Sequence, residues 1–260
     1  MNTLLITGGS SGIGQATADW FAQRGWQVVE LSRHGKGREG VEHVDCDVCS
    51  VESVATAVAK VMEIVDHIDV LISNAGFGIS GPIEFCSEED IRRQMDVNFM
   101  GAVHIVKAVL PIMRSQVRGR IIFTSSVAAI MSIPYQSFYS ASKAAVNALA
   151  FALRNEVREF GIEVSVLMPG DVSTGFTAAR SKSEEGNSVY TNSHSAVEAM
   201  EKDELSGLSP TMMARDMWHI ATCCSPAPQY VGGGQYKVLC LLERLLPKRL
   251  VEWILWKLYH

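Results

Sequence analysis

The sequence predicts an α/β fold, with one doubly wound parallel sheet, helices on both of its faces, and an apolar helical tail at the C-terminus. Two observations lead to this prediction. Short apolar runs rich in β-branched residues alternate with longer helical patterns over roughly the first 170 residues, the order that βαβ units produce. The first of these runs stops at a glycine cluster that opens a helix, which is the context of a phosphate-binding turn.

Length and composition suit one domain over residues 1–260, with 47% hydrophobic and 20% charged residues. A net charge of −5 offers no basic surface to nucleic acid. Cys46-x-x-Cys49 has the spacing of a zinc or redox pair, but no second Cys or His pair accompanies it, so no metal site is predicted. The first strand begins at Thr3, which leaves no room for a signal peptide, and a cytoplasmic protein is expected.

The first strand, Thr3–Thr7, leads into a glycine-rich turn and a helix from Ile13 to about Gln23. Glycines let the backbone turn tightly and approach a pyrophosphate, and the helix N-terminus offers free N–H groups. We therefore expect a dinucleotide-binding turn, formed by Gly8, Ser10, Ser11, Gly12, Ile13 and Gly14.

The second strand, Val28–Leu31, closes at Ser32-Arg33-His34. Nucleotide-binding βαβ units often carry an acid here for the ribose 2′-OH, and this chain has none. Arg33 matches a 2′-phosphate in charge and geometry, and Ser32 is a small hydrogen-bonding neighbour. NADP(H) is therefore predicted over NAD(H), the alternative being a solvated arginine at a strand end.

The alternation continues through strands at Val41–Asp45 and Asp69–Ser73, separated by a helix from Ser50 to about Asp66. A long helix then opens at the Ser87–Asp90 capping box and runs toward Met113. Asn98 lies in an apolar stretch of that helix, where an unsatisfied amide is costly. It has either a specific hydrogen-bonding role or a core position bonded to backbone.

A fifth strand, Arg120–Thr124, is followed by Ser125-Ser126, an apolar linker and a helix that runs to about Phe160. Tyr139 and Lys143 are four residues apart on this helix and so share a face. A neighbouring ammonium is expected to lower the pKa of a phenol toward the range useful for acid–base catalysis. The alternative is an ordinary pair on a solvated helix face.

A sixth strand, Glu163–Leu167, ends at Pro169-Gly170, and every motif so far lies at the carboxyl end of a strand. Residues 175–225 are predicted to form a lid over a substrate, with a polar, mobile stretch at Ser181–Ser193. Helices near 196–205 and 211–224 and a short strand near Tyr230–Val231 complete the domain.

Together these motifs resemble those of the short-chain dehydrogenase/reductase family, over nearly the whole chain. The motifs that carry the resemblance are Thr7-Gly8-x-x-x-Gly12-x-Gly14, Asp47-Val48, Asn74-Ala75-Gly76, Asn98, Ser126, Tyr139-x-x-x-Lys143 and Pro169-Gly170. The serine in that family stands 13 positions before the tyrosine, which selects Ser126 over Ser125. Some NADP(H)-preferring members carry a basic residue where this chain has Ser11, a departure from the pattern.

The resemblance implies a Rossmann-like domain and four catalytic roles. Tyr139 is the implied general acid–base, and Ser126 orients the substrate oxygen and stabilises its developing charge. Lys143 is implied to lower the pKa of the phenol and to bind the nicotinamide ribose. Asn98 is similar to a residue that holds a water in a proton path. The other implied cofactor contacts are Ser32, Arg33, Asp47, Val48, Asn74, Ala75, Gly76, Pro169, Gly170, Val172 and Thr174.

The residues expected around the substrate are apolar, which favours a lipophilic ketone or alcohol of steroid, sphingoid, retinoid or acyl-chain type. The substrate contacts expected are Ser126, Ile133, Tyr135, Tyr139 and Phe176. The alternative is that several of them are ordinary core. The predicted activity is NADP(H)-dependent interconversion of a carbonyl and a secondary alcohol. The alternative function is a non-catalytic NADP(H)-binding redox sensor or scaffold.

The tail, residues 238–260, is strongly apolar but is interrupted by charged residues and Pro247, which argues against a membrane-spanning helix. Leu250, Trp253, Ile254 and Leu258 form one helical stripe. Three uses are open: packing at a subunit interface or over the substrate mouth, peripheral membrane contact through residues 248–259, or simple core. A homodimer or homotetramer is expected.

Overall fold

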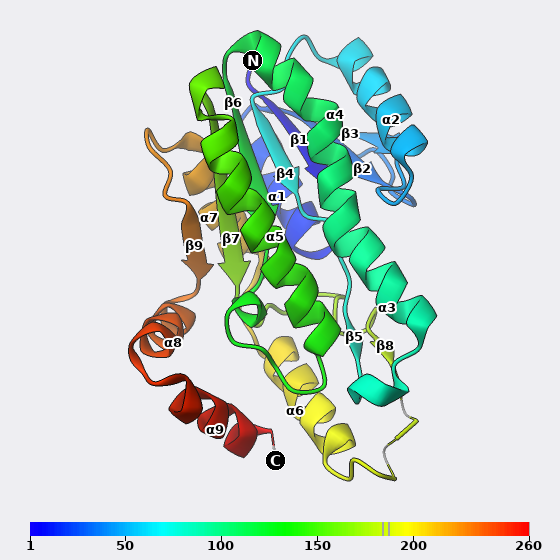
Figure 1. Ribbon diagram of the computed structural model, residues 1–260. Coiled ribbons are helices and arrows are strands. Elements are labelled where there is room, and N and C mark those ends of the chain that lie inside the picture. The colour runs from blue at the N-terminus through cyan, green and yellow to red at the C-terminus, as the bar shows by residue number, and fades with distance from the viewer. Residues whose placement is uncertain (184, 187, 260) are drawn as a thin grey trace.

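A seven-stranded sheet forms the centre of the molecule, in the order β3-β2-β1-β4-β6-β7-β9 with every neighbouring pair parallel (Figure 1). The computed structural model describes residues 1–183, 185–186 and 188–259. Positions 184 and 187 of the predicted lid and position 260 of the tail lie outside the described residues. The strands are β1 (Thr3–Thr7), β2 (Gln27–Ser32), β3 (Val41–Asp45), β4 (Val70–Ser73), β6 (Gly119–Thr124), β7 (Ile162–Pro169) and β9 (Gln229–Gly232).

The strand order confirms the predicted doubly wound sheet. After β3 the chain crosses to the other side of β1 and enters β4, so strand order reverses between β1 and β4. A crevice opens beyond the carboxyl ends of two strands that diverge in this way, and it is where such sheets bind ligands.

Helices cover both faces of the sheet. On one face α2 (Val51–Ile64), α4 (Gly101–Gln116) and α5 (Ser137–Glu156) pack, and on the other α1 (Gly12–Ala22) and α7 (Pro210–Thr222). Successive residues of β1 divide between the two cores, Leu5 into the first and Leu4 and Ile6 into the second. A strand buried on both faces reads as a continuous apolar run, which is why the sequence identifies β1 so clearly.

The long helix predicted from the Ser87 capping box is interrupted. It consists of α3 (Glu88–Met95), a π-helical turn at Asp96–Met100 and α4, and the turn contains Asn98. Such single π turns are frequent at functional sites. The helix with Tyr139 ends at Glu156 rather than Phe160, and a 3₁₀ turn, Arg158–Phe160, follows it.

Two short strands escaped prediction because two residues carry no periodicity. β5 (Ile79–Ser80) pairs in parallel with β8 (Ser181–Lys182), which ties the predicted lid to the loop after β4. The lid continues into α6 (Ser193–Leu205). Buried Arg180 forms an ion pair with Glu204 of that helix.

The run from Glu88 to Gln116 is the one described helical segment with the length and apolar composition to cross a membrane. Ile105, Val109 and Met113 of this run are fully buried against the sheet, so its apolar character serves the core. The tail forms two short helices, α8 (Gly234–Leu245) and α9 (Lys248–Leu258), which lie beyond the carboxyl ends of β7 and β9 (Figure 1).

Candidate active site

The turn between β1 and α1 requires glycine at three positions. Gly8 and Gly12 have φ values of +65° and +54°, in the left-handed region. A Cβ on Gly14 would lie 2.0 Å from the carbonyl oxygen of Gly8. The turn therefore leaves its backbone uncovered at the start of α1, where N–H groups point outward.

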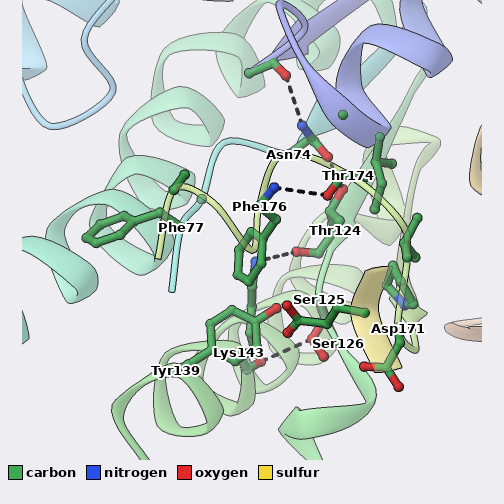
Figure 2. Close-up of a pocket in the computed structure, with 18 of the residues that line it drawn as sticks. Asn74, Phe77, Thr124, Ser125, Ser126, Tyr139, Lys143, Asp171, Thr174 and Phe176 are labelled. Atoms are coloured by element: carbon green, nitrogen blue, oxygen red, sulfur yellow. Dashed lines mark hydrogen bonds between the residues drawn. The ribbon is translucent and has the colours of Figure 1, made fainter. Parts of the chain in front are cut away.

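Asn74 fastens this turn to two neighbouring strands. Its Nδ2 donates to the carbonyl oxygens of Thr7 and Gly8, both at 3.2 Å, and its Oδ1 accepts from Thr124 Oγ1 at 3.1 Å (Figure 2). The Thr7 hydroxyl accepts from the backbone N–H groups of Asn74 and Ala75. Thr7 and Thr124 were not predicted as site residues, although a β-branched polar residue at a strand end in such a sheet is a usable signal.

One cavity of about 340 Å³ at the switch point brings most of the predicted site residues together (Figure 2). A volume of this order suits a small-molecule site. The predicted residues that line it are Gly8, Ser11, Gly12, Ile13, Asn74, Ala75, Gly76, Ser126, Ile133, Tyr139, Lys143, Pro169, Gly170, Val172, Thr174 and Phe176.

Lys143 lies on α5, and its buried side chain reaches the carboxyl end of β6. Its ammonium donates to the carbonyl oxygen of Thr124 at 2.9 Å and lies 5.8 Å from the centroid of the Tyr139 ring. Burial lowers the pKa of this ammonium to about 8. The group is therefore mostly charged at neutral pH and close to titration.

The phenol of Tyr139 differs from the expectation. Its pKa is raised to about 12, chiefly by burial, while the Ser126 hydroxyl acts in the opposite direction. The net direction is opposite to the expected lowering, because removal of the phenol from water is the largest cause of the shift. The phenol is consequently protonated at neutral pH and able to donate.

Ser126 begins the 3₁₀ turn Val127–Ala129, and its Oγ accepts from the N–H of Ala128 at 3.1 Å. That contact fixes the oxygen and directs the hydroxyl hydrogen elsewhere. Across the cavity the Tyr139 ring packs against Phe176, with 5.5 Å between ring centroids. The pair closes the apolar side of the cavity (Figure 2).

Asn98 lies behind the cavity rather than in its wall. It is 2% exposed, and its Nδ2 donates to the carbonyl oxygen of Phe77 and to Ser142 Oγ, both at 3.0 Å. Its Oδ1 accepts from the N–H of Phe77 at 3.0 Å. A Cβ on Gly76 would lie 3.1 Å from that Oδ1 and 3.4 Å from Lys143 Nζ, so the amide and the ammonium flank the same glycine.

Several other predicted residues lie outside the cavity. Tyr135 packs edge-on against Tyr190, with 6.5 Å between centroids, rather than facing the predicted substrate. Arg33 is exposed just after β2. Five more are also absent from its lining: Ser10 in the turn after β1, Gly14 in the first turn of α1, Ser32 at the end of β2, and Asp47 and Val48 after β3.

Two acidic residues of the cavity were missed. Asp171 follows β7, and its Oδ2 accepts from the hydroxyl of Tyr236 at 2.6 Å. Burial raises the pKa of Asp171, opposed by that hydrogen bond. Glu204 reaches the cavity from α6 while its carboxylate is held by Arg180 and Thr177. Asp171 could have been found from the sequence, because it directly follows the Pro169-Gly170 motif. Glu204 is far in sequence from every motif and gave no such signal.

The cavity fits a dinucleotide. The uncovered turn at Gly8–Gly14 suits a pyrophosphate. Thr174 lies next to this turn, and a Cβ placed on Gly12 would lie 3.4 Å from the Thr174 Cβ. A side chain at Gly76 would crowd the Lys143 ammonium, because a Cβ there would lie 3.4 Å from it. Fold and site together define a nucleotide-binding oxidoreductase of the Rossmann type.

The comparisons with known proteins agree with that class. The model of the short chain dehydrogenase family matches residues 2–185, and the chain belongs to the short-chain dehydrogenase/reductase family. It is 39% identical over 257 residues to the 3-ketodihydrosphingosine reductase of Bacteroides thetaiotaomicron, covering 97% of this chain and 96% of that protein.

Solved structures show the same fold. A short-chain dehydrogenase from Streptomyces avermitilis superposes with a TM-score of 0.83 at 28% identity, covering 97% of this chain and 95% of that one. A family member from Burkholderia phymatum, solved in complex with NAD, gives 0.81 at 26% identity, covering 94% and 92%.

The buried ammonium makes a testable contribution to stability. Because the folded state lowers the pKa of Lys143 from 10.5 to about 8, the unfolded chain binds more protons at this residue between those pH values, and stability from this group rises with pH there. We expect Lys143→Met to be more stable than the wild type at pH 7, by about 1–3 kcal/mol after loss of one hydrogen bond. The gain should be largely lost by pH 10.5, where the residue is neutral in the folded state and half charged in the unfolded chain.

Urea unfolding at a series of pH values measures this difference. Lys107→Met, at an exposed position on α4, controls for the added methionine. A difference between Lys143→Met and wild type that is the same at pH 7 and pH 10.5 would contradict the assignment.

Proposed function

We propose that this protein uses NADPH to reduce a ketone on a long-chain lipid to a secondary alcohol, with a 3-keto sphingoid base as the preferred substrate class. The observation that carries the proposal is the convergence of the Tyr139 phenol, the Lys143 ammonium and the Ser126 hydroxyl on one cavity. A phenol kept in its acid form suits reduction, since the carbonyl oxygen must gain a proton as it becomes a hydroxyl.

Each residue has a defined task in this proposal. The Ser126 hydroxyl, with its oxygen fixed by Ala128, donates to the carbonyl oxygen and orients it. Tyr139 delivers its proton to that oxygen. Lys143, mostly charged at neutral pH, stabilises the resulting phenolate and holds ribose hydroxyls. Asn98 fixes the Phe77 backbone beside Gly76 and so keeps the space in front of Lys143 open. The bound cofactor supplies the hydride.

The walls of the cavity favour a lipid. Phe77, Val127, Ile133 and Phe176 provide apolar surface around the phenol. The carboxylates of Asp171 and Glu204 enter the same cavity, which suits a substrate with an amino group near its ketone. A relative that matches nearly the whole chain is named as a 3-ketodihydrosphingosine reductase. The compound in that name is a lipid of this description.

The cofactor preference rests on Arg33. It is exposed just after β2, at the position where the resemblance places a 2′-phosphate contact, and the neighbouring Ser32 hydroxyl donates to Glu30 at 3.3 Å. Against the preference stands the NAD bound by the Burkholderia phymatum relative. The six cysteines are free, which supports a cytoplasmic location, and we expect a homodimer or homotetramer.

Removal of the phenol hydroxyl should abolish turnover. Tyr139→Phe keeps the ring packed on Phe176 but removes the proton donor, so we expect NADPH-dependent reduction of a 3-keto sphingoid base to fall by at least about 10²-fold in kcat. NADPH consumption and the alcohol product are measured together. Tyr135→Phe, outside the cavity, is the matched control and should keep its activity.

Two outcomes would count against the assignment. Wild-type rates in Tyr139→Phe would remove Tyr139 from the chemistry. NADPH binding without turnover of any member of a panel of 3-keto lipids, ketosteroids, retinal and small ketones would favour the non-catalytic binding protein.

Arg33→Ala tests the cofactor preference. Loss of a charge-assisted contact to the 2′-phosphate should weaken NADPH binding by about 10-fold or more and leave NADH binding unchanged. Affinities for both cofactors come from calorimetry, with Lys36→Ala in the same exposed turn as the control. An NADPH-to-NADH affinity ratio equal to that of the wild type would show that Arg33 does not contact the phosphate.

A further inference from the structure

The two tail helices concentrate the exposed apolar surface of the molecule. Half of the large hydrophobic residues that are exposed in the described chain belong to them. These are Val238, Leu239, Leu241, Leu242, Leu245, Leu250, Trp253, Ile254, Trp256 and Leu258. Exposed apolar residues concentrated in one part of a folded protein mark an interaction site.

The exposed residues form stripes. On α8, Val238, Leu241, Leu242 and Leu245 recur three and four residues apart and so share one face. On α9 the predicted stripe of Leu250, Trp253, Ile254 and Leu258 is likewise exposed, while Val251 is the buried residue of that helix. Both helices turn an apolar stripe outward, which rules out the simple core role.

Charge identifies the partner. Residues 234–259 contain five basic and two acidic residues, a net charge of +3, whereas the whole chain carries −5 and the remainder therefore −8. Arg244 and Arg249 are exposed, and neither has an acidic partner within the described part of the chain. A twofold contact between two copies of this face would bring like charges together, while an anionic lipid surface would pair them.

Tryptophan favours the same partner. Trp253 and Trp256 are about half exposed, at 55% and 47%, and Lys257 lies 4.9 Å from the Trp256 ring centroid. Indole side chains are enriched at the boundary between lipid and water, beside basic residues that reach the headgroups.

The tail is attached to the wall of the cavity. The ring of Tyr236 in α8 packs so closely on Gly170 that a Cβ there would lie 2.2 Å from it, and its hydroxyl holds Asp171. Cys240 packs against the same small core cluster as Ile130 and Met131 of the linker after Ser126. α9 then runs back toward α6 (Figure 1). The pKa of Tyr259, at the end of α9, is raised to about 12, first by burial and then by the negative charge of carboxylates that include Asp171.

We propose that α8 and α9 form a docking surface for an anionic membrane, which holds the mouth of the cavity at the bilayer so that a lipid substrate enters without crossing water. The route for the substrate rests on the proposed function. The docking itself does not, because it depends only on the exposed stripes and the basic residues.

Co-sedimentation of the full chain with vesicles tests the docking. We expect the wild type to bind vesicles of phosphatidylcholine with 30% phosphatidylglycerol, to bind pure phosphatidylcholine at least about 10-fold more weakly, and to be released by salt. Leu250→Gln with Trp253→Gln should weaken binding by at least about 10-fold, and so should Arg244→Gln with Arg249→Gln. The controls are Ile83→Gln and Arg158→Gln, exposed positions outside the tail.

Three outcomes overturn the proposal: a wild type that stays in the supernatant, tail variants that bind like the wild type, or tail variants that change the sedimentation velocity of the protein without lipid, which would make this face a subunit interface. Reduction of a short, water-soluble ketone without vesicles reports on the chemistry alone. If the wild type binds vesicles but does not reduce this ketone, the proposed function is wrong and the docking surface is still supported.

Discussion

The buried contact between the Lys143 ammonium and the Thr124 carbonyl oxygen at 2.9 Å is the constraint on which the site depends. It joins the middle of α5 to the carboxyl end of β6 and thereby fixes Tyr139, one helical turn earlier, at the switch point of the sheet. The same β6 end holds Asn74 through the Thr124 hydroxyl, and Asn74 holds the glycine turn. The carboxyl end of β6 thus positions the Tyr139 phenol, the Lys143 ammonium and the glycine turn.

Burial shifts the pKa values of Tyr139 and Lys143 in opposite directions. It raises the pKa of the phenol to about 12 and lowers that of the ammonium to about 8, since in both cases the neutral form is favoured. The result is a protonated donor beside a cation that is close to titration. In the proposed reaction, this arrangement favours proton delivery to the substrate and places the conjugate base next to a positive charge when it forms.

The sequence predicted the sheet, its helices and most of the cavity, because β1 is a continuous apolar run and the glycines of the first turn are required by backbone geometry. It did not predict β5 and β8, which are two residues long, or the π turn at Asn98, which leaves the apolar pattern unchanged. Tyr135 shows a further limit, because its direction depends on tertiary packing against Tyr190. The direction of the Tyr139 pKa shift also differed from the prediction, because residue spacing indicates how close two groups lie but not how far they are removed from water.

In the free protein the Tyr139 phenol keeps its proton well above neutral pH, because removal from water raises its pKa. Carbon-13 NMR of protein labelled at the tyrosine ζ-carbon, with the resonance assigned by its loss in Tyr139→Phe, follows this phenol through a pH titration. We expect Tyr139 to remain mostly protonated up to about pH 11, above the midpoint of about pH 10 for a free tyrosine. A Tyr139 signal that titrates to phenolate between about pH 7 and pH 8 would contradict it.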